Sequence, residues 1–115
     1  MRTITEDRIL HPLTKETTSD ESSPFKCASR QGTAYLDVTA KSGNKPRLNV
    51  FVEEQDSLSK KWFPIATFTR ATDITTERKF VPFIASRSIR ARWIITGKGN
   101  LSFTFSVNLS GKEVA

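Results

Sequence analysis

At 115 residues the chain has the length of one domain, and its 18 Lys and Arg against 12 Asp and Glu give a formal net charge of +6 at pH 7. Its apolar segments are all shorter than the roughly 20 residues of a membrane-spanning helix, no basic-then-apolar leader opens it, and its single cysteine cannot form an internal disulfide. We therefore expect one domain without a secretion signal or a membrane partner, stabilised by a hydrophobic core in which Cys27 is a small buried side chain.

The first 23 residues are polar and hold three basic against five acidic residues, so the excess positive charge belongs to the rest of the chain. No strand or helix period persists through them. Their apolar residues form a small set that we call the N-terminal cluster: Ile4, Ile9, Leu10 and Leu13. We predict an extended N-terminal arm over residues 1–23 that lies on another subunit, followed by a β-sandwich domain over residues 24–115.

From residue 24 onward, apolar and polar residues alternate in short segments, which is the period of a strand with one buried face. The predicted strands cover residues 24–31, 34–40, 48–53, 62–68, 79–84, 88–95 and 101–110. Turn-forming residues separate several of them, as at 42–46 and 56–60. Pro64 and Pro82 each interrupt a segment, which favours an edge strand or a bulge at those places.

The alternation is clearest in the last two segments, which lie on either side of a glycine-rich break. The apolar positions are Ile89, Ala91, Trp93 and Ile95 before the break and Leu101, Phe103, Phe105, Val107 and Leu109 after it. A helix would spread these side chains around its circumference. We therefore predict two paired strands, a hairpin over residues 87–111 that turns at residues 97–100.

Seven short strands without a convincing helix predict an all-β fold. We expect a two-layer antiparallel β-sandwich, Ig-like or jelly-roll-like, with the inner faces of its sheets packed against each other. The residues expected at the centre of the core are Trp62, Trp93, Phe103 and Phe105.

The sequence predicts no catalytic, cofactor or metal site, so we expect a protein that is not an enzyme and has no cofactor. His11 is the only histidine and precedes Pro12 in a polar segment, so we expect it to be solvated. Glu53 and Glu54 point to opposite faces of a regular strand and cannot act as an acid–base pair. No Gly-rich phosphate loop or calcium-binding loop frames the other acidic residues.

Basic residues are the other candidates for binding. Arg90 and Arg92 share the outer face of one predicted strand, and Arg87 flanks them. Nucleic-acid binders interleave such residues with exposed aromatic rings, whereas here most aromatic residues fall on inward positions, with Phe51 and Phe63 as the exceptions. We therefore expect a basic face that is solvated or meets an acidic protein surface rather than nucleic acid. These three arginines and the N-terminal cluster are the predicted partner-binding residues.

Several segments resemble a family of small β-sandwich proteins from tailed bacteriophages and prophages. They are LDVTAKSG at 36–43, Pro46 with LNV at 48–50, Lys61-Trp62 with Phe68, RARWIITG at 90–97 and SFTFSV at 102–107. The resemblance covers roughly residues 33–110 and consists of strand-and-turn patterns. It does not extend to the predicted arm, and Asn44-Lys45 replaces the small-residue turn of the family.

The resemblance implies a non-enzymatic structural protein of the virion. We expect a decoration or cement protein on the capsid exterior that links neighbouring subunits, with the major capsid protein or other virion proteins as partners and with self-association. Its expected location is the virion, and the host cytoplasm during assembly. Two alternatives stay open: a neck or tail structural protein, and a carbohydrate-binding module, which a solvent-facing Trp62 would support.

Overall fold

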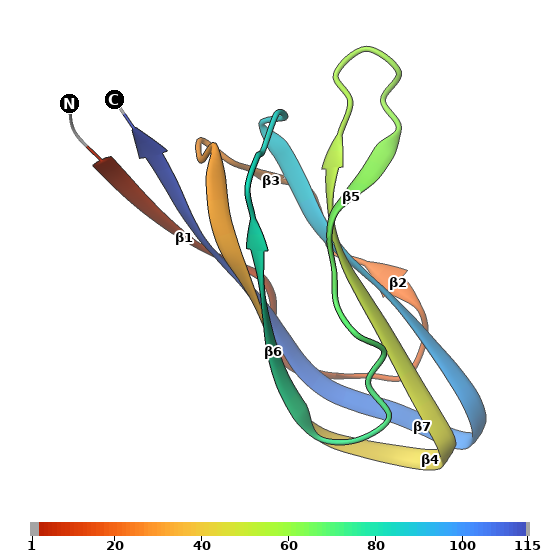
Figure 1. Cartoon of the computed structure of the whole chain (residues 1–115). Coiled ribbons are helices and arrows are strands. Elements are labelled where there is room, and N and C mark those ends of the chain that lie inside the picture. Colours follow the sequence, from red (N-terminus) through yellow and green to blue (C-terminus); the bar gives the residue numbers. More distant parts are fainter. Residues whose placement is uncertain (1–2, 115) are drawn as a thin grey trace.

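A computed structural model describes residues 3–114, with side chains described for residues 5–112. These residues form seven strands: β1 (Thr3–Glu16), β2 (Asp20–Glu21), β3 (Phe25–Lys26), β4 (Gln31–Gln55), β5 (Trp62–Thr67), β6 (Thr75–Val81) and β7 (Ser88–Val114) (Figure 1). All the strand pairs are antiparallel, and the sheet curls into a half-barrel. The predicted all-β antiparallel fold is confirmed.

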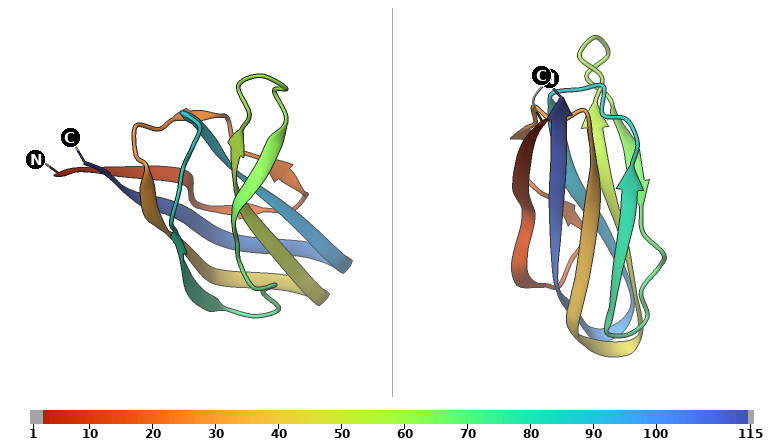
Figure 2. Two further views of the ribbon diagram at one scale, coloured as in Figure 1. Left: turned by 45° about the horizontal axis from the view of Figure 1, so that its top comes forward. Right: turned by 60° about the vertical axis from the view of Figure 1, so that its left-hand side comes forward.

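The two longest strands, β4 and β7, form the ladder around which the fold is built. They pair from Gln31 opposite Lys112 at one end to Glu54 opposite Ile89 at the other. Both strands fold back midway, at residues 42–47 of β4 and 97–101 of β7, so that each runs down the molecule and returns (Figures 1 and 2). The fold-back brings the two halves of the ladder face to face, which is consistent with a β-sandwich.

The fold-back requires glycine in β7. Gly97 has a φ of 137°, which side chains rarely tolerate, and a Cβ there would lie 2.7 Å from the Leu101 side chain and 3.0 Å from the carbonyl oxygen of Lys45. Gly99 also has a positive φ, of 80°. The turn predicted at residues 97–100 is therefore present.

The pairing predicted for that turn is wrong. Residues 88–95 and 101–110 do not form a hairpin with each other: they are the two halves of β7, and each half pairs with β4. The rings of Trp93 and Phe105 have centroids 5.6 Å apart, because the two halves face each other across the core. Alternation identifies the buried face of a strand but not the strand beside it.

The fold-back divides the sheet into two halves whose inner faces meet. The first half consists of β1, the second part of β7, the first part of β4 and β6. The second half consists of β2 and β3, the first part of β7, the second part of β4 and β5. The largest fully buried side chains come from both halves: Phe103, Phe105, Leu10, Leu36, Leu48, Ile84, Ile89 and Leu109.

Three of the four residues predicted at the core centre lie there: Trp93, Phe103 and Phe105. Trp62 does not, because it is half-buried on the outer face of the second half, beneath Arg90. The bulge expected near Pro64 is present, as a register shift between Val52 and Glu53, which lies opposite Pro64. Cys27 is buried as predicted, and burial raises the pKa of its thiol.

The segment predicted as an arm belongs to the same sheet, as the edge strand β1 and the short strand β2. β1 pairs with β7 from Thr3 opposite Val114 to Glu16 opposite Phe103, instead of projecting from the domain. Register shifts on either side of His11 interrupt the two-residue period, so Leu10 and His11 are both buried. The interrupted period explains why the sequence shows no strand pattern here.

Candidate functional site

The N-terminal cluster divides between the core and the surface. Leu10 is 1% exposed and belongs to the core, so its predicted role in partner binding is wrong. Ile9 and Leu13 are 61% and 57% exposed and are available to a partner. The backbone of Ile4 pairs with that of Glu113 in the sheet, but its side chain lies outside the described residues.

The predicted arginines also have different environments. Arg87 is exposed in the segment that precedes β7, whereas Arg90 and Arg92 are half-buried. The latter two share the outer face of the second half of the sheet, as their spacing in the strand predicts. Between them lies Glu53, which is only 3% exposed although it is charged.

Glu53 binds both arginines through separate oxygens. The Nε of Arg90 donates to Oε1 of Glu53 at 3.0 Å, and the Nε of Arg92 donates to Oε2 at 3.0 Å. The register of the sheet explains this contact, because Glu53 of β4 lies directly opposite Arg90 of β7. Hydrogen bonds between ionised groups are about twice as strong as those between neutral groups.

Aromatic rings complete the cluster. The guanidinium carbon of Arg90 lies 4.2 Å from the ring centroid of Trp62, and that of Arg92 lies 4.5 Å from the ring of Phe51. Both distances are typical of cation–π contacts. We call this set the Glu53 cluster: Glu53, Arg90, Arg92, Trp62 and Phe51. Its arginines are occupied by partners within the chain, so this face is not the open basic patch that the sequence suggests.

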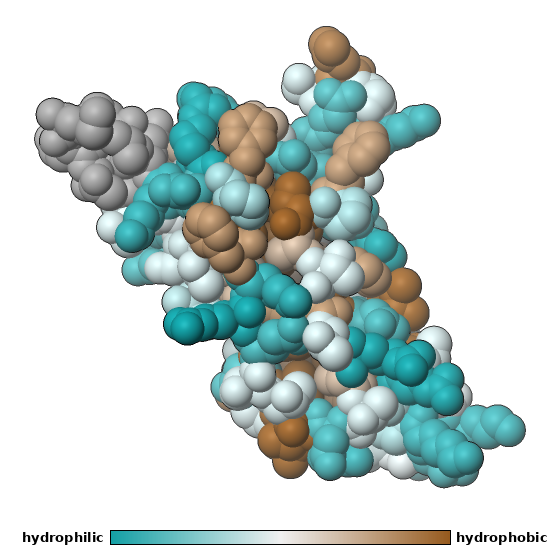
Figure 3. All heavy atoms as spheres, in the orientation of Figure 1, coloured by the Kyte–Doolittle hydropathy of each residue, from teal (hydrophilic) through white to brown (hydrophobic). Residues whose placement is uncertain are grey.

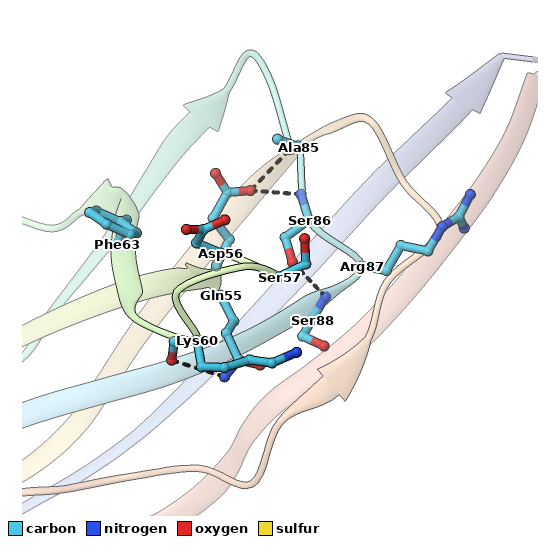
Figure 4. Close-up of a pocket in the computed structure, with 10 residues that line it drawn as sticks. Gln55, Asp56, Ser57, Lys60, Phe63, Ala85, Ser86, Arg87 and Ser88 are labelled. Carbon is cyan, nitrogen blue, oxygen red and sulfur yellow. Dashed lines mark hydrogen bonds between the residues drawn. The ribbon is translucent and has the colours of Figure 1, made fainter.

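A surface pocket lies on the same half of the molecule, between the loop that joins β4 to β5 and the segment that precedes β7 (Figure 4). Its volume is about 480 Å³. Glu54 connects the two sides, because its Oε1 accepts hydrogen bonds from the backbone N–H groups of Ala85 at 2.9 Å and Ser86 at 3.0 Å. Phe63, which is 51% exposed, lies at one side, and Arg87 extends away from the carboxylates.

The loop that borders the pocket is held by Asp56. Its carboxylate accepts hydrogen bonds from the Ser59 hydroxyl at 2.7 Å, the Ser59 N–H and the Leu58 N–H, which together lower the pKa of Asp56. The side-chain amide of Gln55 donates to the carbonyl of Lys60 at 3.0 Å. An aromatic ring beside carboxylate, amide and hydroxyl groups can hold a small polar ligand.

His11 is buried, and the expectation that it is solvated is wrong. Its Nδ1 donates to the carbonyl of Phe105 at 2.9 Å, and its ring stacks on that of Phe105 with centroids 4.3 Å apart. Its Nε2 lies 3.8 Å from Glu16 Oε2, and its ring contacts Trp93 edge-on. These contacts attach β1 to the core, which is a structural role.

The side chains of residues 5–112 include no group of three or more His, Cys, Asp or Glu residues that could hold a metal ion. No helix long and apolar enough to cross a membrane occurs within residues 3–114.

Comparisons with known proteins give likeness of fold but no family. No protein-family model matches the chain, and no curated protein matches it. A structure of infectious bursal disease virus Gx strain aligns over 97% of this chain with a TM-score of 0.58 and 9% identity, and this chain spans 32% of the length of that one.

The CBM36-1 domain of a multidomain xylanase, from the hindgut metagenome of Trinervitermes trinervoides, also aligns over 97% of this chain. The TM-score is 0.50, the identity is 8%, and all of that domain is covered. At these identities the two likenesses concern the fold alone.

Proposed function

We propose that the chain is a non-enzymatic structural protein of a tailed-phage virion. In this proposal it binds the capsid surface as a decoration or cement protein that links neighbouring subunits, with the major capsid protein or other virion proteins as partners. It also associates with copies of itself. It is located in the virion, and in the host cytoplasm during assembly. A neck or tail position is the closest alternative.

One observation carries this proposal: nearly the whole chain aligns with part of a virus structure, as a folded-over antiparallel sheet. The segments that resemble small phage β-sandwich proteins support it independently, and they include Trp62, Arg90 and Arg92 of the Glu53 cluster. The exposed Ile9 and Leu13 on the edge strand β1 offer apolar contacts to a neighbouring copy.

The proposal is tested by fractionation of the host particle. Particles are purified through a density gradient, washed at rising salt concentration and analysed by quantitative mass spectrometry for this chain. We expect the chain to sediment with the particles at a fixed ratio to the major shell protein. Recovery of the chain only as a free monomer in the soluble fraction would contradict the proposal.

A carbohydrate-binding module is the second candidate, and the pocket beside Phe63 favours it. Trp62 does not supply the ring platform, because Arg90 covers it, but Phe63 is half-exposed next to carboxylate, amide and hydroxyl groups. Titration calorimetry with xylan-derived oligosaccharides tests this function. Binding that is lost in Phe63→Ala and kept in Phe83→Ala, a control at another exposed phenylalanine, would establish it; absence of binding would reject it for this substrate class.

A further inference from the structure

The end of the molecule where β4 and β7 fold back carries a concentration of positive charge. Five exposed basic side chains share this end, which we call the basic tip: Lys41, Lys45, Arg47, Arg70 and Lys98. It lies opposite the end that bears the termini (Figure 1), and hydrophilic side chains gather there on the surface (Figure 3). The tip was not among the predicted binding residues.

Strand register places three of the five residues together. At the fold-back, Asn44 of β4 pairs with Lys98 of β7, and Arg47 pairs with Thr96. Lys45 lies between these two pairs, in a left-handed conformation with a φ of 50°. The same backbone that reverses both long strands therefore presents their cations at one end.

The segment between β5 and β6 brings the other two cations. Ala71 forms a two-way backbone bridge with Leu48, with both N···O distances 2.8 Å, which places the adjoining Arg70 beside the fold-back of β4. The ammonium of Lys41 lies 3.5 Å from Asp73 Oδ1 in the same segment.

The tip holds most of the excess charge of the chain. Residues 41–48, 70–74 and 96–101 contain five cations and one carboxylate, that of Asp73, for a net charge of +4 out of the +6 of the whole sequence. Two acidic residues near the tip are offset by lysines. Glu16 adjoins Lys15 at the end of β1, and Glu77, which binds Thr69 beside Arg70, lies 3.4 Å from the Lys79 ammonium. Like charges at one end of an elongated molecule raise the local potential and steer it toward a negative surface.

The composition and shape of the tip favour a protein partner over nucleic acid. The three described segments contain no aromatic residue on which bases could stack. The molecule measures 52 × 29 × 19 Å and the tip is one of its narrow ends (Figure 2), whereas single-stranded nucleic acid is held along a basic groove. Ile74, which is 61% exposed, adds an apolar side chain next to the cations.

We propose that the basic tip docks onto an acidic patch of a protein partner, with Lys45, Arg47 and Lys98 contacting carboxylates and Ile74 packing at the margin. The identification of this partner as a virion protein rests on the function proposed above. Docking through this end leaves the termini directed away from the partner.

Binding to immobilised poly-glutamate over a series of salt concentrations tests the inference. The tip variant is Lys45→Glu with Arg47→Glu. The control variant is Lys26→Glu with Lys112→Glu, which has the same net charge but alters exposed residues that pair with Ser88 and Gln31, at the end opposite the fold-back. We expect the tip variant to bind about tenfold more weakly at low salt, and the control to stay within about twofold of the unaltered chain.

Equal weakening in both variants would overturn the inference, because it would mean that net charge alone drives binding. A short DNA duplex is measured in parallel, and tighter binding to DNA that the tip variant loses would assign the tip to nucleic acid instead. Thermal unfolding of both variants checks that they are folded. Absence of the chain from particles would refute the proposed function but would not change the poly-glutamate result. Failure of the proposed function can therefore be distinguished from failure of the docking inference.

Discussion

The Glu53 cluster and the basic tip both contain arginines in β-strands, but their charges are arranged in opposite ways. In the cluster, Arg90 and Arg92 both form ion pairs with one buried carboxylate, and each also contacts an aromatic ring. In the tip, five cations are exposed, and the carboxylate of Asp73 pairs with Lys41. The first arrangement stabilises the sheet, whereas the second leaves charge available to a partner. The location of arginines in a sequence does not separate these roles, because the register of the neighbouring strand decides between them.

The largest expected effect comes from removing the charge at the centre of the cluster. Glu53→Gln leaves two half-buried guanidinium groups without a carboxylate. We expect the free energy of unfolding to fall by about 2–3 kcal/mol. This loss is smaller than that for a fully buried ion pair, because both arginines are partly exposed. Urea denaturation measures the loss. The control is Asp73→Asn, which removes the exposed carboxylate of the tip and should leave the free energy of unfolding unchanged within error. Similar losses of stability for the two variants would contradict the claim that the Glu53 cluster stabilises the sheet and the basic tip does not.

A change from arginine to lysine should also affect stability in the Glu53 cluster but not in the basic tip, and the expected effect is smaller. Arg92→Lys keeps the positive charge but loses the planar group that lies between Glu53 and the Phe51 ring, so we expect a loss of about 1 kcal/mol in unfolding free energy. Arg47→Lys at the tip should leave stability unchanged within error. The measurement is again urea denaturation, and a neutral result for Arg92→Lys would show that its geometry contributes nothing beyond charge.

The smallest expected effect concerns acid pH at the tip. The Ile74 N–H donates to Asp73 at 2.7 Å, and with the Lys41 ammonium it holds the pKa of Asp73 below its ordinary value of 3.8. A lowered folded-state pKa means that this carboxylate contributes stability above pH 3.8, and that the contribution is lost as pH falls toward the folded value. NMR titration of Asp73 should show the lowered pKa, and Lys41→Gln should raise it partway. A pKa at or above 3.8 in the unaltered chain would contradict the assignment.

The sequence was sufficient to predict the strands with an unbroken alternation, and it failed where bulges or long-range register decide the outcome. Trp93, Phe103 and Phe105 alternate regularly with polar residues and lie in the core as predicted. The strand β1 was missed because two register shifts around His11 interrupt its period. The predicted hairpin over 87–111 was wrong because both halves of β7 pair with β4, which precedes β5 and β6 in the chain.

The candidate sites were predicted less completely than the fold. The spacing of Arg90 and Arg92 predicts that both side chains lie on the outer face of the sheet. Their contact with Glu53 could not be predicted, because Glu53 is 37 residues from Arg90 and no local pattern connects the two. The basic tip could have been found from turn chemistry, since Lys45 and Lys98 lie in the two glycine-containing breaks. Their proximity, however, depends on both long strands folding back at the same level, which is a property of the ladder.

Electron cryomicroscopy of the purified host particle tests the central claim most directly, because it reports both the presence and the orientation of the chain. We predict density for the folded-over sheet on the particle surface, with the basic tip against an acidic protein patch and the termini directed outward. Particles without such density, or with the tip facing solvent, would contradict this account.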